Sequence, residues 1–231
     1  MWSEPILIEN NQHNEKFHSF FIDTEGLGAY DEEINHDSKI FLVAVLISSL
    51  FILNSFGNID ENSINSLSFI INLSKTIKLT NNSNESNPDD LAKYFPNLLS
   101  LLRDFSLKLE DTQGNCITAK QYLENALQLQ KGNSEVVEEK NKVRKLITTY
   151  FKDRDCFSMV RPVENEKDLQ NLQTLEDNLI RREFLDQAET LRTKVFKKVK
   201  PKIFNNKVLS GSMLIELLES IIDSKNKGAV P

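Results

Sequence analysis

Cysteine is scarce in this chain of 231 residues, which contains only Cys116 and Cys156. The two lie far apart, and neither has a histidine or cysteine neighbour at the spacing of metal ligands. Two cysteines also do not make the disulfide framework of a small secreted protein. The scarcity argues against a disulfide scaffold and a cysteine-based metal site, and it favours a reducing, cytoplasmic environment.

Positive charge is in short supply as well. The chain has 28 lysines and arginines against 34 aspartates and glutamates, which gives a net charge of −6 at pH 7, and its pI is about 5.3. This balance argues against a nucleic-acid partner, which requires a basic footprint. We interpret the one basic cluster as the solvated end of a helix, with a phosphate or membrane patch as the alternative. The cluster consists of Lys194, Lys197, Lys198, Lys200 and Lys202.

Long apolar runs are missing. The strongest stretch, residues 40–53, has about 14 residues, whereas a membrane-spanning helix needs about 20. The first residues show no basic segment followed by an apolar core, and residues 228–231 carry no prenylation motif. We therefore expect membrane association only through regions outside this chain.

Glycine occurs 7 times, and nowhere is there a Gly-rich phosphate loop that ends in Lys-Ser or Lys-Thr. An acidic turn that suits nucleotide chemistry is nevertheless present, because Asp23-Thr24-Glu25-Gly26 directly follows the apolar run Phe20-Phe21-Ile22. An aspartate at the end of a buried strand can hold a water bound to magnesium. The amide of Gly26 can approach a terminal phosphate closely, since no Cβ blocks it. The alternative is a structural turn in which the glycine supplies a positive φ.

Short apolar runs alternate with helical patterns along the chain. This alternation predicts an α/β fold in three layers, with a mostly parallel sheet covered by helices on both faces. We expect one domain over residues 1–231, a helix capped by Asp60, and a mobile polar loop at 81–90. The expected strands are Phe17–Asp23, Leu50–Asn54, Leu98–Leu102 and Cys156–Val160. The expected helices are Lys39–Ser49, Thr118–Lys131, Ser134–Phe151, Glu166–Leu175, Arg182–Val199 and one from about Ser210 onward.

Charged residues follow three of the expected strands. If the strands are parallel, these residues emerge at one edge of the sheet, where ligands bind in such folds. Asp23 follows the first strand, Arg103-Asp104 the third, and Arg161 the fourth. A carboxylate at Asp104 can accept hydrogen bonds from the ring N1–H and the exocyclic amine of guanine, which adenine cannot offer. The alternatives are a surface pair between Arg103 and Asp104 and an exposed arginine at 161.

Taken together, these segments resemble the large GTPase domain of guanylate-binding proteins, in the dynamin-related superfamily. The resemblance covers nearly the whole chain. It rests on the segments Phe21–Gly28, Ser38–Ser49, Phe51–Asn58, Leu102–Leu107, Tyr122–Leu127, Cys156–Pro162, Leu209–Gly211 and Gly228–Pro231. The family implies a P-loop GTPase fold, GTP as substrate, magnesium-dependent transfer of the γ-phosphoryl group to water, and a homodimer formed through the GTPase domains.

The resemblance also assigns roles to individual residues. It implies that Asp23 holds Mg²⁺ through water, and that Glu25 and Gly26 form the catalytic turn at the γ-phosphate. Arg103 and Asp104 would read the guanine, and Arg161 would belong to the cap over the base and to the dimer contact. In the family the segment after Arg161 is often basic, whereas here it is Val163-Glu164-Asn165-Glu166.

The start of the chain departs most from the family. Met1-Trp2 resembles a segment just beyond the switch I threonine, so we expect these residues to be an N-terminally truncated G domain without its P-loop. Such a chain is expected to hydrolyse GTP negligibly by itself, because the P-loop supplies most of the charge neutralisation in phosphoryl transfer. The rival hypothesis is a degenerate pseudo-GTPase that acts as a protein-interaction module.

Overall fold

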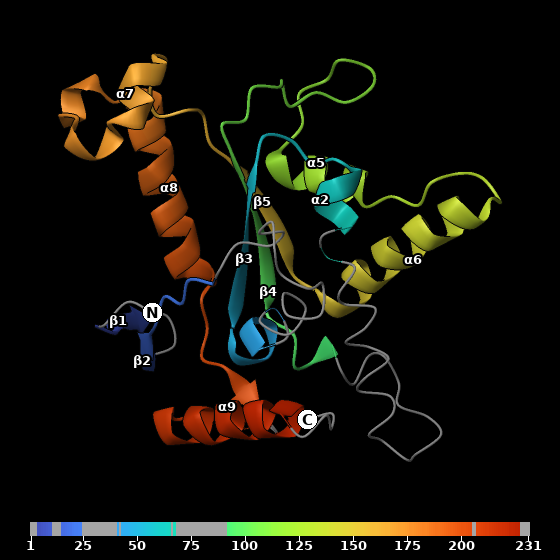
Figure 1. The fold of residues 1–231 in the computed structure, drawn as a ribbon, viewed down its shortest axis with the longest axis vertical. Helices are drawn as coiled ribbons and strands as arrows, with labels where there is room; N and C mark the ends of the chain where they lie inside the picture. The colour runs from blue at the N-terminus through green and yellow to red at the C-terminus, as the bar shows by residue number, and fades with distance from the viewer. Residues whose placement is uncertain are drawn as a thin grey trace. The chain divides into compact units, whose positions relative to one another are not determined.

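The structure is a computed structural model that describes residues 4–10, 15–24, 41, 43–65, 67, 92–204 and 207–226. The chain forms two compact units (Figure 1). We call one of them the central unit because it comes from the middle of the sequence, Ile52–Leu67 and Asn97–Lys198. We call the other the outer unit because its segments, Met1–Phe51, Ser68–Pro96 and Val199–Pro231, include both ends of the sequence. The expected loop at 81–90 and the acidic turn from Glu25 onward lie outside the described residues.

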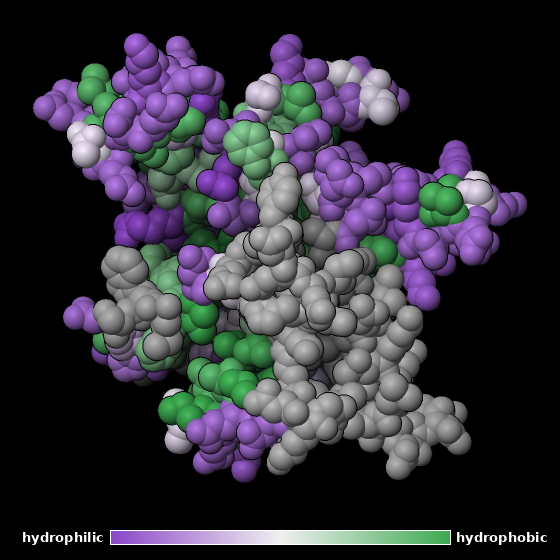
Figure 2. All heavy atoms as spheres, viewed as in Figure 1, coloured by the Kyte–Doolittle hydropathy of each residue, from purple (hydrophilic) through white to green (hydrophobic). Residues whose placement is uncertain are grey.

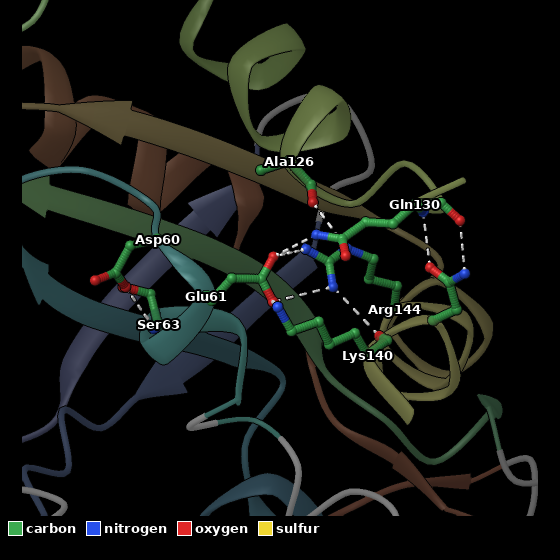
Figure 3. A network of polar contacts seen from close by, with 8 residues as sticks. Asp60, Glu61, Ser63, Ala126, Gln130, Lys140 and Arg144 are labelled. Atoms are coloured by element: carbon green, nitrogen blue, oxygen red, sulfur yellow. Dashed lines mark hydrogen bonds and ion pairs between the residues drawn. The ribbon is translucent and has the colours of Figure 1, made fainter. Parts of the chain in front are cut away.

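The central unit is built around a parallel sheet. Its three strands are β3 (Leu50–Phe56), β4 (Asn97–Arg103) and β5 (Arg154–Ser158), in the order β3-β4-β5. β4 and β5 pair in parallel register, with Leu98 opposite Arg154 and Leu102 opposite Ser158. The arrowheads of all three strands point the same way (Figure 3). The predicted α/β class with a parallel sheet is therefore confirmed, and each of these strands overlaps its predicted range.

Side-chain caps begin the helices of this unit. Asp60 Oδ1 accepts from the Ser63 amide at 2.7 Å at the start of α2 (Glu61–Asn65), as predicted. Thr118 and Gln121 form a capping box at α5 (Ala119–Ala126), and the Ser134 hydroxyl accepts from the Val137 amide at α6 (Glu135–Tyr150). The remaining elements are α7 (Glu166–Gln170), the 3₁₀ turns η2 (Leu172–Thr174) and η3 (Asp177–Leu179), and α8 (Arg182–Lys198).

The core of the central unit lies between the sheet and the helices α5 and α6. Leu98, Leu99 and Leu102 of β4 are at most 1% exposed, which explains why this strand reads as apolar throughout. Ile147 and Tyr150 of α6 are buried with them, at 1% and 2% exposed. The viewed faces of α6 and α7 carry mainly hydrophilic side chains (Figure 2). Each helix in the described part of the chain is too short or too polar to cross a lipid bilayer.

The lysine cluster differs from its predicted form as a solvated helix end. Lys194 Nζ lies 3.0 Å from Asp155 Oδ2, and Lys198 Nζ lies 3.1 Å from Asp153 Oδ1. Asp155 follows the first residue of β5 and is largely buried, so its desolvated carboxylate requires a cationic partner. The prediction was therefore wrong for these two lysines, whereas Lys197 and Lys200 are exposed.

The outer unit contains antiparallel hairpins. β1 (Ile6–Asn10) pairs with β2 (Glu15–Ser19), and β6 (Ile203–Phe204) pairs with β7 (Lys207–Val208). The predicted strand Phe17–Asp23 was wrong beyond Ser19, because the register with β1 ends at that residue. In the described part of the chain the next residues, 20–24, are not assigned to a strand, and Phe20, Phe21 and Ile22 are 40–48% exposed. The unit ends in helix α9 (Gly211–Asn226), close to its predicted start.

A buried lysine joins three segments of this outer unit. Lys202 Nζ donates to the carbonyl oxygens of Ser48 and Tyr94, both at 2.7 Å. Burial lowers the pKa of Lys202 to about 8, because the charged form loses its hydration there. A neutral amine still has two N–H groups to donate, so deprotonation can keep both bonds.

Substitution of this lysine by methionine is expected to change how stability depends on alkaline pH. The pKa of Lys202 is about 8 in the folded chain and 10.5 in the unfolded chain, so the unfolded chain binds more protons between these values. Wild-type stability should therefore gain a favourable contribution as the pH rises from 8 to 10.5. Urea unfolding at several pH values should show this contribution in wild type and in the exposed control Lys200→Met. The prediction fails if Lys202→Met retains it.

An ion pair between α2 and α6 is the centre of a network of polar contacts in the central unit (Figure 3). The Arg144 side chain is 3% exposed, and its guanidinium binds the Glu61 carboxylate. Its Nε and Nη1 also donate to the carbonyl oxygens of Ala126 and Lys140 at 3.2 and 3.3 Å. Gln130 donates to the same carboxylate at 2.7 Å. The network therefore ties α2 to the end of α5 and to α6.

Replacement of Glu61 by glutamine is expected to lower the free energy of unfolding by about 1–2 kcal/mol, because it leaves a buried guanidinium without its counter-charge. The value is below that of a fully buried pair because Glu61 is 35% exposed. The hydrogen bond from Arg144 lowers the pKa of Glu61 from 4.5. Wild type should therefore lose this contribution as the pH falls below about 4.5, and Glu61→Gln should not. Equal acid dependence of the two proteins in chemical denaturation would contradict the assignment.

Candidate functional site

The chain leaves β4 through an unusual backbone turn at Asp104. This residue has a φ of 54°, in the left-handed region that is uncommon for residues other than glycine and is adopted occasionally by asparagine and aspartate. A hydrogen bond to β5 holds the residue after this turn, because the Phe105 amide donates to the carbonyl oxygen of Met159 at 2.9 Å. The Phe105 ring also meets Tyr122 of α5 edge-on, with ring centres 5.6 Å apart. These anchors hold the Asp104 backbone at the carboxyl end of the sheet.

The end of β5 is anchored on both sides. Met159 continues the pairing with β4, because its amide donates to the carbonyl oxygen of Leu102 at 2.8 Å. The next amide, that of Val160, donates to Oε1 of Gln187 in α8 at 2.8 Å. Beyond Arg161, the carbonyl oxygen of Pro162 accepts from the Arg181 amide, also at 2.8 Å. Arg161 therefore stands between two fixed backbone positions.

Asp104 and Arg161 face each other across the two strand ends. Arg161 Nε lies 3.9 Å from Asp104 Oδ2, and the side chains are 34% and 21% exposed. This separation is too long for a hydrogen bond. The Nε atom is sealed from water and has no hydrogen-bond acceptor among the described residues. The pair thus places a partly exposed carboxylate beside a partly exposed arginine side chain, which suits a ligand that presents both donors and an acceptor.

The structure brings together three of the six predicted site residues. Arg103 lies beside Asp104 with an exposed side chain, and its carbonyl oxygen accepts from the Gly57 amide at 2.7 Å. This bond joins the end of β4 to the turn after β3. Asp23 is exposed and belongs to the outer unit. Glu25 and Gly26 lie outside the described residues. The roles assigned to all six remain predictions.

Magnesium suits the residues available, as far as they are described. The described residues contain no group of three or more histidine, cysteine or acidic side chains that could enclose a metal ion. Magnesium does not require such a group, because it commonly keeps several waters and takes one or two carboxylates together with substrate phosphates. The exposed carboxylate of Asp23 matches that partial donor set.

Gln187 is a contact of this site that sequence reasoning missed. It lies within the predicted helix 182–199, and nothing in the local sequence distinguishes it from the other polar residues of that helix. Its role depends on the Val160 amide, which is 27 residues away in the chain. Gly57 lies in the turn after β3, and its φ of 73° explains why that turn contains glycine.

Comparison with known proteins identifies the chain's relatives. Residues 1–203 match the family described as guanylate-binding protein, N-terminal domain. The chain is 32% identical to guanylate-binding protein 4 of Homo sapiens over 237 residues, which cover 100% of the chain and 36% of that relative. It is 34% identical to guanylate-binding protein 1 of Chlorocebus aethiops over 215 residues, which cover 91% of the chain and 36% of that relative. The chain thus spans about a third of the length of these curated relatives.

The left-handed backbone at Asp104 gives a direct prediction about stability. Glycine adopts this conformation without a steric penalty, so Asp104→Gly is expected to raise the free energy of unfolding by up to about 1 kcal/mol. The matched control is Gly114→Ala at a φ of 83°, where a Cβ would meet nothing within 4 Å. That change should lower stability by about 1 kcal/mol through backbone strain alone. Urea unfolding measures both, and a loss of stability in Asp104→Gly would contradict the assignment of strain.

Proposed function

We propose, because the chain belongs to the guanylate-binding protein family, that it forms the guanine-recognising part of a GTPase. In the whole protein this GTPase would bind GTP and transfer the γ-phosphoryl group to water with Mg²⁺. One observation carries the proposal: the carboxylate of Asp104 and the unpaired Nε of Arg161 meet at the carboxyl edge of a parallel sheet. Ligands of α/β proteins bind at this edge.

The chemistry of guanine supports Asp104 as the residue that reads the base. The ring N1–H and the exocyclic amine of guanine form a pair of donors that one carboxylate can accept. Adenine presents a different pattern and would leave the carboxylate of Asp104 unpaired in a partly buried place, which costs binding free energy. Arg103 and Arg161 flank the carboxylate and would pack on the nucleotide.

The phosphate side of the proposed site rests on the acidic turn. Asp23 would hold Mg²⁺ through a water, and Glu25 and Gly26 would lie at the γ-phosphate. When bound, Mg²⁺ neutralises charge on the phosphate oxygens. The 231 residues contain no GxxxxGK[ST] loop, so we expect negligible hydrolysis of GTP by this chain alone. We also propose a cytoplasmic location and, for the complete protein, a homodimer through the GTPase domain.

A second candidate function is that of a pseudo-GTPase which binds other proteins without nucleotide. This candidate function does not require a GxxxxGK[ST] loop, which holds the phosphates of GTP and does not occur in the 231 residues. The two candidates differ in a simple property: only the first requires a preference for guanine. A base-specific binding measurement therefore separates them without any need for hydrolysis.

Substitution of Asp104 by asparagine is expected to exchange guanine for xanthine as the preferred base. An asparagine can accept from the ring N1–H and donate to the C2 carbonyl that xanthine carries in place of the amine. NMR titration of the 231-residue chain with GMP and XMP should show a preference for GMP in wild type. The preference should reverse by about tenfold or more in Asp104→Asn.

Asp111→Asn is the control, because Asp111 is a half-buried carboxylate, as Asp104 is, and lies in the loop after β4, outside the candidate site. It should leave the preference for GMP unchanged. An unchanged preference in Asp104→Asn would show that this residue does not read the base. If wild type binds neither nucleotide, the interaction module is the better description.

A further inference from the structure

Helix α8 lies along the free edge of β5. In the described sheet β5 has β4 as its only neighbour, so its other edge presents backbone groups that lack a strand partner. Three residues of α8 contact this edge in turn: Gln187 binds Val160, Lys194 binds Asp155, and Lys198 binds Asp153. Spacings of seven and four residues place all three on one face of the helix. As residue numbers rise along α8 they fall along β5, so the two elements run antiparallel.

Just beyond the carboxyl end of β5, Gln187 of α8 contacts the backbone of the candidate site. Backbone amides of a strand alternate between its two sides. The Met159 amide donates to Leu102 in β4, so the Val160 amide points to the opposite side, where no strand is described. Oε1 of Gln187 accepts this hydrogen bond at 2.8 Å and takes the place of a strand carbonyl. Without it, a partly buried amide would lose its partner.

We propose that Gln187 is a positioning residue of the guanine site, which acts through the backbone of Val160 on Arg161. The inference rests on the proposed function. Gln187 fixes the amide of the residue before Arg161, and the Arg181 amide fixes the carbonyl oxygen of the residue after it. Two anchors from the start of α8 and the residue before it therefore determine where the Arg161 side chain leaves the sheet.

The separation between Arg161 and Asp104 is sensitive to these anchors. At 3.9 Å the Nε atom and the carboxylate are close but not bonded, so a small displacement of Arg161 either closes the pair or moves it apart. A closed pair would occupy the carboxylate that the base needs. A larger separation would move the Arg161 side chain away from the base. Binding sites tolerate errors of only about 0.5 Å in such groups, and one hydrogen bond at the strand end controls a shift of that size.

Substitutions at Gln187 separate positioning from general support of the fold. Gln187→Leu keeps the approximate volume and removes the acceptor, whereas Gln187→Glu keeps an acceptor at the same distance along the side chain. We expect the dissociation constant for GMP, measured by NMR titration of the 231-residue chain, to rise about tenfold in Gln187→Leu. In Gln187→Glu it should stay within about twofold of wild type, since the bond to Val160 is retained.

Lys194→Gln is the control on the same face of α8. It removes the nearer of the two lysine partners of the largely buried Asp155, the other being Lys198 at 3.4 Å, and lies seven residues from Gln187. It should lower the melting temperature and leave the dissociation constant for GMP unchanged. If Gln187→Leu instead lowers the melting temperature and leaves GMP binding intact, Gln187 only stabilises the fold, and the inference is wrong.

A double-mutant cycle with Arg161→Ala tests the route of the effect. If Gln187 acts through Arg161, then Gln187→Leu should cause no further loss of GMP binding once Arg161 has been removed. Independent, additive losses would overturn the inference while leaving the proposed function intact. Absence of GMP binding in wild type would instead overturn the proposed function, and the inference with it.

Discussion

Parallel pairing of β4 with β5 is the constraint on which the candidate site depends. The register puts Leu102 opposite Ser158, and the bond from the Met159 amide to Leu102 carries the pairing one residue further. The residues that follow the two strands therefore emerge at the same edge. A shift of one residue would turn every side chain of β5 to the opposite face of the sheet and would separate Asp104 from Arg161. The burial of Leu98, Leu99 and Leu102 opposes such a shift.

The surrounding helices hold this edge without contributing charge to it. Arg144 ties α2, α5 and α6 together at one face of the sheet, and the lysines of α8 pair with the aspartates of β5. These buried or half-buried ion pairs contribute little net stability when both partners are present, but breaking one is costly. Their physical effect is to favour one arrangement of helices around the strand ends. The loosely paired Asp104 and Arg161 then stand out from a unit whose other buried charges are closely paired.

The sequence predicted the central unit better than the outer one, for physical reasons. β4 and α6 are long and strongly patterned, and caps such as Asp60 and Ser134 mark where helices begin. The apolar run Phe20-Phe21-Ile22 led to a wrong prediction, because an apolar composition suggests a buried strand whereas these residues are exposed and follow the end of β2. The two-residue strands β6 and β7 are too short to leave a pattern. Gln187 could not be found from sequence, since its partner is a backbone amide.

The geometry at Asp104 explains how the guanine site that we propose would be selective before a ligand arrives. A left-handed φ of 54° costs free energy, and it persists because the bond from Phe105 to Met159 and the packing of Phe105 on Tyr122 fix both sides of the turn. Arg161 neutralises part of the carboxylate charge at 3.9 Å without taking its hydrogen-bonding capacity. The carboxylate thus stays available, and a base that offers two donors gains hydrogen bonds that a base without them must forgo. Selectivity then follows from the Asp104 carboxylate, which is already positioned before binding, rather than from a pocket that closes around the ligand.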